Sequence, residues 1–452
     1  MGNLFGTDGI RGIANEFPLT PEIAVSVGRA VVSTLPVISK KTKVVIGKDT
    51  RISGDMLEHA LASGISAMGG EVRLAGILPT PGVAFLTAST DAGAGMVISA
   101  SHNPFYDNGI KIFDGNGDKL FDEVETRIEK AVFDDQKSNH RNAVRETGRV
   151  IQLDDAPQRY KQFLKQTLGK KTPFKGLKVV LDCSNGAAYQ VAPELFSELG
   201  ADVEALSIQP DGKNINADCG SEHPQSLAKS VIENKADIGL AFDGDGDRLI
   251  AADENGQILT GDRILAICAK VFKQKGVLNN NTVVSTVMSN LGLRKALKEL
   301  DIDHVMTRVG DRYVLQAMRA NGAVIGGEDS GHMIFLDDHT TGDGILSALK
   351  LIESMQTEAQ PLSELGNIMT VYPQALINVN VERKPDLQSI PEVVDAIESV
   401  EKMLGEEGRV LVRYSGTQPL CRVMVEGPGE RETRKYCNQI ADIIEEKLGP
   451  GS

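Results

Sequence analysis

Residues 238–252 read IGLAFDGDGDRLIAA, in which two short apolar runs flank a loop of aspartates and glycines. Short apolar runs bounded by turn residues are typical of buried β-strands. Comparable runs recur along the chain and alternate with segments that have the apolar spacing of helices. Predicted strands cover 44–46, 72–78, 95–98, 178–181, 238–242, 249–252, 282–287 and 323–325, and predicted helices cover 20–32, 55–68, 122–132, 187–199, 225–234, 262–272 and 294–300. This alternation predicts an α/β protein with mixed sheets flanked by helices.

Changes in composition divide the chain into four predicted domains. The segment 134–149 is charged and poor in apolar residues, and we expect it to end the first unit. After residue 369 the pattern changes to an α+β arrangement, with strands at 375–381, 409–413 and 422–426 before a helix at 430–448. We therefore expect three successive α/β domains and a smaller C-terminal α+β domain around a shared central cleft. The expected boundaries are 1–152, 153–256, 257–368 and 369–448, with a disordered tail at 449–452.

The composition limits the classes of partner. The 452 residues contain 48 Lys and Arg against 62 Asp and Glu, a formal net charge of −14. Nucleic acids and anionic membrane surfaces attract basic proteins, so neither is an expected partner, and no apolar stretch is long enough to span a membrane. The five cysteines are odd in number, widely spaced and without a C-x-x-C pair, which indicates reduced thiols and a cytoplasmic location.

The aspartates of the opening segment form the first candidate site. Asp243, Asp245 and Asp247 alternate with glycines in one tight loop, where like charges repel unless a cation compensates them. All-oxygen ligation favours Mg²⁺ or Ca²⁺. An EF-hand is the first alternative, but Arg248 occupies the loop position that needs glycine and the flanks are strand-like. A solvated acidic turn is the second alternative.

A serine follows the predicted strand 95–98 in the segment VISASHNP at 97–104. A side chain just past a strand end is exposed and rigidly held, which suits Ser101 as a nucleophile or phosphate carrier. A serine hydroxyl is a weak nucleophile and needs a base or an electrophile nearby, for which His102 and Lys111 are the candidates. The alternative is an ordinary Ser/Asn/Pro turn that links two elements.

Residues 326–332 read GGEDSGH and again follow a predicted strand. Glu328, Ser330 and His332 offer a carboxylate, a hydroxyl and an imidazole at short range, a set that suits the hydroxyl or amino groups of a sugar. A glycine-rich turn with ordinary polar residues is an equally compatible interpretation.

Residues 413–419 read RYSGTQP and lie between two predicted strands. The guanidinium of Arg413, the hydroxyls of Ser415 and Thr417 and the backbone N–H groups around Gly416 could form a nest for a phosphate dianion. The alternative is a loop whose Ser and Thr side chains bond their own backbone.

Two further turns carry cations, GKDTR at 47–51 and RVGDR at 308–312. Charged side chains are mostly exposed in folded proteins, so we expect both turns to be solvated surface.

Each of the four predicted domains thus contributes one loop with chemistry. The chain lacks the Walker P-loop, the kinase catalytic-loop string, H-E-x-x-H and G-x-S-x-G. Phosphoryl transfer between a serine and a phosphosugar, assisted by one metal ion, accounts for all four loops together. Two other classes stay open at this point: a metal-dependent phosphatase that uses Ser101, and a non-enzymatic Ca²⁺-binding protein.

The four loops resemble, in order and over nearly the whole chain, those of the α-D-phosphohexomutases. SHNP at 101–104 is similar to the phosphoserine loop of that family, DGDGDR at 243–248 to its metal loop, GEDSGH at 327–332 to its sugar loop and RYSGT at 413–417 to its phosphate loop. The resemblance implies an isomerase that acts as an intramolecular phosphotransferase on a small phosphosugar. A sugar 1,6-bisphosphate is then the intermediate and activator, and a homodimer is the implied assembly.

The resemblance also implies roles for the residues. Ser101 carries a phosphoryl group and binds one Mg²⁺ together with Asp243, Asp245 and Asp247. Charge stabilisation and general acid–base catalysis fall to Arg11, His102, Lys111 and Arg248. Sugar hydroxyls are bound by Glu328, Ser330 and His332, and the phosphate that does not react is bound by Arg413, Ser415, Gly416 and Thr417.

Four further segments resemble the branch of that family which acts on glucosamine phosphates in bacteria: FGTDGIRG at 5–12, GKDTRISG at 47–54, NPFYDNGIK at 103–111 and VGDRYV at 309–314. This likeness implies interconversion of glucosamine 6-phosphate and glucosamine 1-phosphate, which supplies UDP-N-acetylglucosamine for cell-wall synthesis. The chain departs from that branch where Asp329 replaces a usual Gln, Tyr414 a usual Lys and Gln418 a usual Glu. Phosphoglucomutase or phosphomannomutase activity by the same mechanism is therefore the alternative.

Overall fold

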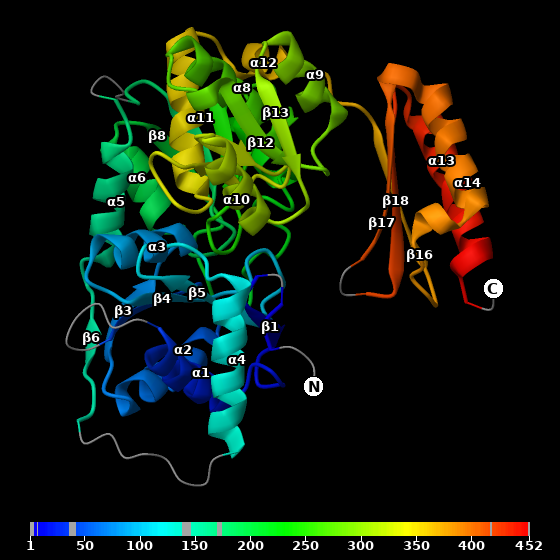
Figure 1. Cartoon of the computed structure of the whole chain (residues 1–452). Helices are drawn as coiled ribbons and strands as arrows, with labels where there is room; N and C mark the ends of the chain where they lie inside the picture. The colour runs from blue at the N-terminus through cyan, green and yellow to red at the C-terminus, as the bar shows by residue number, and fades with distance from the viewer. Residues whose placement is uncertain are drawn as a thin grey trace. The chain divides into compact units, whose positions relative to one another are not determined.

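The computed structural model describes residues 4–6, 8–35, 42–137, 146–169, 174–415 and 418–450. The chain divides into two compact units, the first formed by Met1–Met288 with Ile302–Ile368 and the second by Ser289–Asp301 with Met369–Ser452. Figure 1 shows the order of the elements along each unit. None of the helices in the described residues is long and apolar enough to cross a membrane.

The first sheet of unit 1 carries the loop of residues 101–104, which we call the serine loop. Its strand order is β1 (Ile10–Ile13), β5 (Asp107–Asp114), β4 (Ala94–Ile98), β2 (Lys43–Lys48), β3 (Glu71–Ile77) and β6 (Val150–Gln152). The β1–β5 and β5–β4 pairs are antiparallel and the other pairs are parallel. β4 is buried along its whole length because helices pack on both faces of the sheet.

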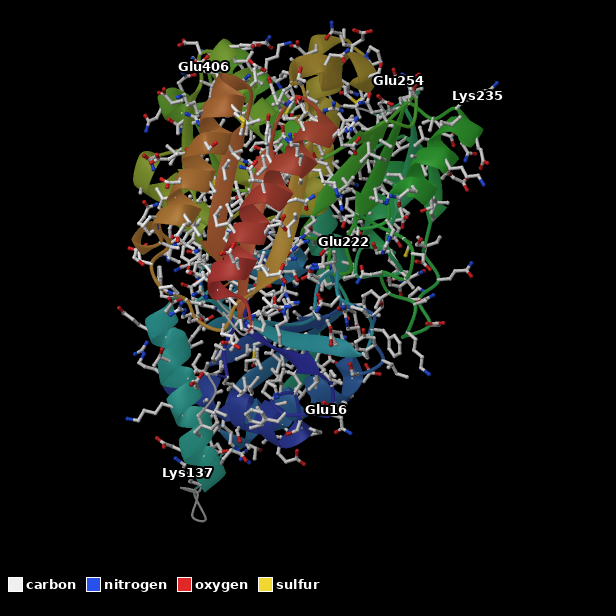
Figure 2. The ribbon with its side chains drawn as sticks, turned by 90° about the vertical axis from the view of Figure 1, so that its right-hand side faces the viewer. Glu16, Lys137, Glu222, Lys235, Glu254 and Glu406 are labelled. Atoms are coloured by element: carbon white, nitrogen blue, oxygen red, sulfur yellow. The ribbon has the colours of Figure 1, made fainter. Side chains whose placement is uncertain are left out.

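Helices α1 (Pro21–Thr34), α2 (Gly54–Ala67) and α4 (Asp122–Lys137) share an apolar core with one face of this sheet, and α3 (Thr80–Ser89) packs on the other face (Figure 1). The Thr20 side chain starts α1 by accepting a hydrogen bond from Ile23 N, and proline occupies the first helical position. α4 ends at Lys137, which is labelled in Figure 2.

The second sheet carries the loop of residues 243–248, which we call the aspartate loop. Its order is β11 (Ile258–Leu259), β10 (Leu249–Asp253), β9 (Ile238–Phe242), β7 (Lys178–Asp182) and β8 (Asp202–Leu206), and α6 (Val191–Glu198) and α7 (Gln225–Asn234) pack on it. Helix α5 (Ala156–Gln166) contacts α6 and also α3 and β3 of the first sheet. β9 and β10 are buried at every position, which explains why both read as unbroken apolar runs.

The third sheet carries the loop predicted to bind sugar. Its order is β13 (Asp303–Thr307), β12 (Thr282–Thr286), β14 (Ile325–Gly327) and β15 (Met333–Phe335), and its helices are α8 (Gly261–Gln274), α10 (Asp311–Asn321), α11 (Gly344–Glu358) and α12 (Leu362–Leu365). The predicted strand 323–325 is misplaced by two residues. The apolar residues Ala323 and Val324 are buried, but the ladder with β12 and β15 begins only at Ile325.

Unit 2 is an antiparallel sheet in the order β16 (Gln374–Asn380), β18 (Leu420–Glu426) and β17 (Arg409–Tyr414), with α13 (Pro391–Leu404) and α14 (Glu430–Leu448) packed against it. It also includes α9 (Leu291–Glu299), whose first N–H donates to the buried Glu426 carboxylate at 3.2 Å. The predicted α/β class with mixed sheets and an α+β C-terminal part is confirmed. Of the predicted tail 449–452, residues 451–452 lie outside the described chain.

Candidate active site

Ser101 and the aspartate loop lie in contact in unit 1. The Oγ of Ser101 donates a hydrogen bond of 2.6 Å to Oδ2 of Asp243, although 142 residues separate them in the sequence. Both side chains are buried, with 2% and 0% exposed. Ser101 has a left-handed φ of 52°, which residues with a Cβ atom rarely adopt. The two segments that the sequence predicted to meet therefore do meet.

The aspartate loop connects the antiparallel strands β9 and β10, and this excludes the EF-hand alternative, which requires flanking helices. Asp243, Asp245 and Asp247 are buried, and each offers an oxygen within 4.8 Å of the others. Burial, followed by repulsion from the other two aspartates, raises the pKa of Asp243 well above its ordinary value. In the described chain, Oδ1 of Asp245 and Oδ1 of Asp247 are buried without a hydrogen-bond partner. Crowded carboxylates with unpaired oxygens fit a hard divalent cation such as Mg²⁺.

Lys111 supplies positive charge from the opposite side of these carboxylates. It lies inside β5, and its Nζ is 2.8 Å from Oδ2 of Asp245, 3.3 Å from Oδ2 of Asp247 and 3.2 Å from Oδ2 of Asp8. Burial alone lowers the pKa of this ammonium, but the three carboxylates outweigh burial and hold the pKa well above its ordinary value. Lys111 therefore pairs with the Oδ2 atoms of Asp245 and Asp247, and the Oδ1 atoms of both residues make no hydrogen bond, although Arg248 Nε lies 3.9 Å from Oδ1 of Asp247.

Three further basic side chains, those of His102, Arg248 and Arg11, belong to the same site. His102 Nδ1 is 3.4 Å from the serine Oγ, and burial followed by the charge of Arg248 lowers the pKa of this imidazole, which keeps it neutral near pH 7. Arg248 Nη1 lies 3.2 Å from a carboxylate oxygen of Glu222, which is labelled in Figure 2. Arg11 is linked to the same site because its Nη2 lies 2.6 Å from Oδ2 of Asp8. All the predicted catalytic residues thus lie around the serine and the aspartates.

The segment 326–332 joins β14 to β15 and packs on the aspartate hairpin, because Leu249 N donates to Gly331 O at 3.0 Å. Its side chains differ in environment. Ser330 is exposed, whereas Glu328 is partly buried and accepts a hydrogen bond from Gly310 N at 3.0 Å. His332 is buried, and its Nε2 lies 3.5 Å from Asp311 and 4.0 Å from Asp247.

The predicted phosphate loop belongs to unit 2. Arg413 at the end of β17 is the register partner of Arg422 on β18, and burial, followed by the charge of Arg422, lowers its pKa. Ser415 is buried, and its carbonyl oxygen accepts a hydrogen bond of 2.6 Å from Lys384 Nζ. Gly416 and Thr417 lie outside the described residues.

Comparison with known sequences agrees with this arrangement of loops. Four domain families match in chain order: phosphoglucomutase/phosphomannomutase alpha/beta/alpha domain I at 2–139, domain II at 158–256, domain III at 260–372 and the C-terminal domain at 376–443. The chain belongs to the phosphoglucomutase/phosphomannomutase family. It is therefore a phosphohexomutase, an enzyme of the isomerase class.

Curated relatives of this phosphohexomutase match it from end to end. The phosphoglucosamine mutase of Syntrophus aciditrophicus is 57% identical over 449 residues, covering 99% of this chain and 100% of the relative, and that of Syntrophobacter fumaroxidans is 56% identical with the same coverage. A solved phosphoglucomutase/phosphomannomutase family protein from Burkholderia thailandensis is 25% identical, with a TM-score of 0.81 over 100% of this chain and 98% of the other. A putative phosphomannomutase from Thermus thermophilus has the same fold, with 23% identity and a TM-score of 0.77 over 98% of each chain.

Of the two cationic turns that the sequence suggested to be solvated, the first is part of this phosphohexomutase's interior, so that prediction is wrong. The second turn is solvated at Arg308, as predicted, but Asp311 and Arg312 are partly buried in ion pairs. In the first turn Arg51 and Asp49 are buried and paired with each other, and Ser99 Oγ donates to Asp49 at 2.5 Å. β2 and β4 are parallel neighbours, so their carboxyl ends place Asp49 and Ser99 together. Knowledge that β2 and β4 are neighbouring strands would have identified Asp49, but no local sequence pattern encodes that strand pairing.

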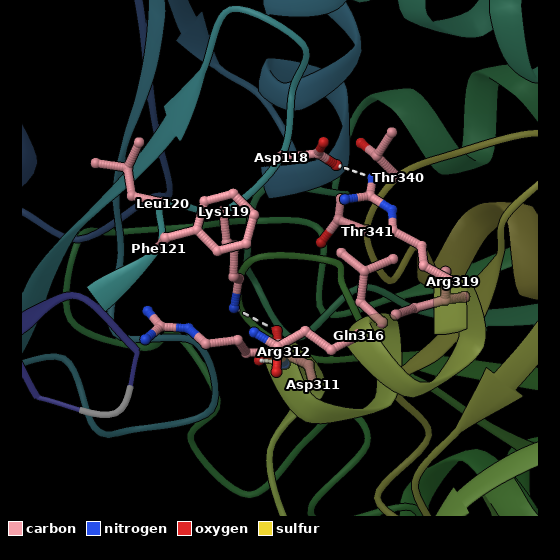
Figure 3. A pocket seen from close by; sticks show the side chains of 12 residues that line it. Asp118, Lys119, Leu120, Phe121, Asp311, Arg312, Gln316, Arg319, Thr340 and Thr341 are labelled. Carbon is pink, nitrogen blue, oxygen red and sulfur yellow. Dashed lines mark hydrogen bonds and ion pairs between the residues drawn. The ribbon is translucent and has the colours of Figure 1, made fainter. Parts of the chain in front are cut away.

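The second turn, at the start of α10, joins the third sheet to the segment after β5. Asp311 pairs with Lys119, and Arg319 Nη2 lies 2.6 Å from Oδ1 of Asp118 (Figure 3). Arg312 Nη2 also lies 2.9 Å from Glu125. These ion pairs line a pocket between the two segments and hold Asp311 near the buried His332.

Sequence analysis also missed a residue that fixes the aspartate loop. Thr80, the first residue of α3, donates from Oγ1 to Oδ2 of Asp245 at 2.6 Å, and its N–H donates to the carbonyl of the same residue at 2.9 Å. A lone threonine before an apolar segment gives no sign of such a role.

Proposed function

We propose that this phosphohexomutase interconverts glucosamine 6-phosphate and glucosamine 1-phosphate, and that Ser101 carries the phosphoryl group. The hydrogen bond of 2.6 Å between Ser101 Oγ and Asp243 is the observation that carries the assignment of Ser101, because it places a hydroxyl against a cluster of unpaired carboxylate oxygens. The choice of sugar is supported by relatives that are 57% and 56% identical over their full length and are named phosphoglucosamine mutases.

Asp243, Asp245, Asp247 and the oxygen of Ser101 are the residues that would hold Mg²⁺. When bound, the ion neutralises charge on the transferring phosphoryl group. The chain's own cations act in the same direction, since Lys111 is held protonated by three carboxylates and Arg248 Nε lies 3.9 Å from Oδ1 of Asp247. In such a dry, preorganised site, electrostatic stabilisation of the transition state is the largest contribution to catalysis.

The reaction has two balanced transfers. In the first, a sugar hydroxyl oxygen attacks the phosphorus on Ser101, the P–Oγ bond breaks, the sugar hydroxyl loses its proton and the serine oxygen gains one. The resulting sugar 1,6-bisphosphate then reorients end over end in the site. Its other phosphoryl group is transferred to Ser101 by the reverse exchange. Each orientation needs the same contacts, which Glu328, Ser330 and His332 provide for the ring and Arg413, Ser415, Gly416 and Thr417 for the phosphate that stays.

We further propose a cellular location and an assembly for the enzyme. Five buried thiols without disulfide bonds are consistent with the reducing cytoplasm, where we place the protein. A homodimer is the assembly that the family resemblance implies, and the solution molecular mass tests it.

Intact-mass measurement of the purified protein tests the role of the serine. We expect about one phosphate per chain in the wild type, and the loss of both phosphate and mutase activity in Ser101→Ala. Steady release of inorganic phosphate without isomerisation would instead identify a phosphatase. With Mg²⁺ and trace sugar bisphosphate, kcat/KM should be highest for glucosamine 6-phosphate, and a higher value for glucose 1-phosphate or mannose 1-phosphate would overturn the choice of sugar.

A further inference from the structure

Two carbonyl oxygens of the serine loop are each bound by the same two side chains. Asn216 Nδ2 donates to Ser101 O at 2.9 Å and to Asn103 O at 3.0 Å. Arg51 Nη2 donates to the same two carbonyl oxygens, with a distance of 3.2 Å to Ser101 O. An NH₂ group has two hydrogens, so each of these groups spans both carbonyls. We call this arrangement the carbonyl clamp.

The two halves of the carbonyl clamp come from different parts of unit 1. Arg51 follows β2 and is fixed by its pairing with the buried Asp49 and by a bond of 2.8 Å from its Nε to Asp107 O. Asn216 lies between β8 and α7, and its N–H donates to Ser184 O at 2.9 Å. The serine loop is therefore held between the first and second sheets by side chains that are themselves buried.

The aspartate loop packs directly on the carbonyl clamp. A Cβ atom added at Gly244 would lie 2.5 Å from Ser101 O and 2.8 Å from Asn216 Nδ2, both too close for any side chain. Position 244 must therefore be glycine so that the aspartates can approach the serine loop. The clamp, the left-handed backbone of Ser101 and the glycine together set the position of the serine Oγ relative to Asp243.

We propose that Arg51 and Asn216 are positioning residues for phosphoryl transfer: they hold the carbonyls of Ser101 and Asn103 so that the Ser101 oxygen stays aligned with the aspartate loop. The proposal rests on the proposed function, because it assumes that Ser101 carries the phosphoryl group. Neither residue contacts the reacting atoms, so their loss should affect the rate of transfer and leave sugar binding intact.

The decisive variants are Asn216→Ala, which removes the amide, and Asn216→Asp, which keeps its size but replaces both donor hydrogens with an acceptor. A displacement of about 1 Å at a reacting atom costs roughly 10²-fold in rate. We expect kcat to fall ~10–100-fold in the Ala variant and further in the Asp variant, with KM for glucosamine 6-phosphate within about twofold of the wild type. Asn214→Ala is the matched control, since it removes an amide of the same loop that bonds Gln209 O instead, and it should keep the wild-type kcat.

The measurement is single-turnover transfer from phosphorylated Ser101 to glucosamine 6-phosphate in the Mg²⁺-loaded full chain, with the phosphoserine ³¹P spectrum and the melting temperature recorded for each variant. A slowed transfer, a shifted ³¹P line and an unchanged melting temperature support the clamp. The proposal is overturned if folded Asn216→Ala transfers the phosphoryl group at the wild-type rate. It is also overturned if the substitution changes only the melting temperature or only KM. If the Ala variant does not fold, the isosteric Asp variant carries the same test. Mutase activity in Ser101→Ala would refute both the proposed role of Ser101 and the positioning role of the carbonyl clamp. If only the positioning role is wrong, mutase activity will still depend on Ser101.

Discussion

The aspartate loop and the loop at 326–332 belong to the same unit and follow buried strands in the same way, yet they differ in how their side chains are held. Asp243, Asp245 and Asp247 are at most 4% exposed and are fixed by a serine, a threonine and a lysine from the first sheet and its helices. In the other loop Ser330 is exposed and Glu328 is partly buried. The aspartates are thus held in place before substrate arrives, whereas two of the three side chains that we propose to bind the sugar, Glu328 and Ser330, stay at least partly accessible and only His332 is buried.

The largest expected effect comes from the preorganised loop. Asp245→Asn removes a charge that faces both the metal position and Lys111, and leaves that ammonium with two carboxylates instead of three. We expect kcat to fall by roughly 10²–10³-fold, because charge stabilisation of this kind contributes that much in a buried site. Steady-state assays at saturating Mg²⁺ measure the effect.

Asp218→Asn is the control for that change, because it makes the same substitution at an exposed position between β8 and α7. It should leave kcat within about threefold of the wild type, as surface substitutions usually have small effects. Equal losses in the two variants would mean that burial and pairing in the aspartate loop have no special importance.

The second prediction concerns how the free energy of unfolding depends on pH, and it begins with a buried histidine. His339 is buried, its Nε2 lies 2.9 Å from Pro81 O and its Nδ1 accepts a hydrogen bond from Thr340 N at 2.8 Å. Burial lowers its pKa from 6.5 to about 4. Between these values the unfolded chain binds the proton and the folded chain does not, so this contribution to stability is present above pH 6.5 and is lost as the pH falls toward 4.

The difference in free energy of unfolding between the wild type and His339→Gln should therefore rise with pH across that window, by at most about 3 kcal/mol. Asp343 should show the opposite pH dependence. Burial raises its pKa from 3.8 to about 7, so its contribution to stability is lost as the pH rises through that range. The corresponding difference for Asp343→Asn should fall with pH. Urea unfolding at several pH values measures both, and slopes of the same sign would contradict this assignment.

The smallest effect is expected at the predicted phosphate loop of unit 2. Arg413→Gln removes a guanidinium at the end of β17, where we place the phosphate that does not react. A hydrogen bond to a charged group contributes about 1.5–3 kcal/mol, so KM for the sugar phosphate should rise about 10–100-fold, with a smaller change in kcat. Arg431→Gln, an exposed position on α14, is the control that should change neither. A fall in kcat at constant KM would place Arg413 in the preorganised class instead.

Local patterns predicted much of the fold because the buried strands and amphipathic helices are visible in short windows. The bounds of α7 and α14 match the predicted 225–234 and 430–448. Six helices in the described residues were not predicted: α3, α5, α10, α11, α12 and α13. Of these, α3 and α11 are buried on nearly every side, so neither shows an amphipathic period, and α3 also contains a proline and a glycine.

The candidate site could be predicted only in part from the sequence. Ser101, Asp243, Asp245 and Asp247 sit in short motifs just after strands, where local reasoning is informative. The supporting residues Asp49, Arg51, Thr80 and Asn216 acquire their roles from strand order and from contacts between sheets. Charged Asp49 and Arg51 are stable in the interior because they pair with each other, and only the fold determines that pairing.

The central claim is that Ser101 and the aspartate loop bind one metal ion between them. Electron–nuclear double resonance on the Mn²⁺-substituted phosphoprotein tests this directly, since a phosphate bound to Mn²⁺ gives a strong ³¹P hyperfine coupling. We predict that coupling in the wild type, and its absence in Ser101→Ala even when Mn²⁺ still occupies the aspartates. Mn²⁺ bound at the aspartates of phosphorylated wild-type protein without ³¹P coupling would contradict the account.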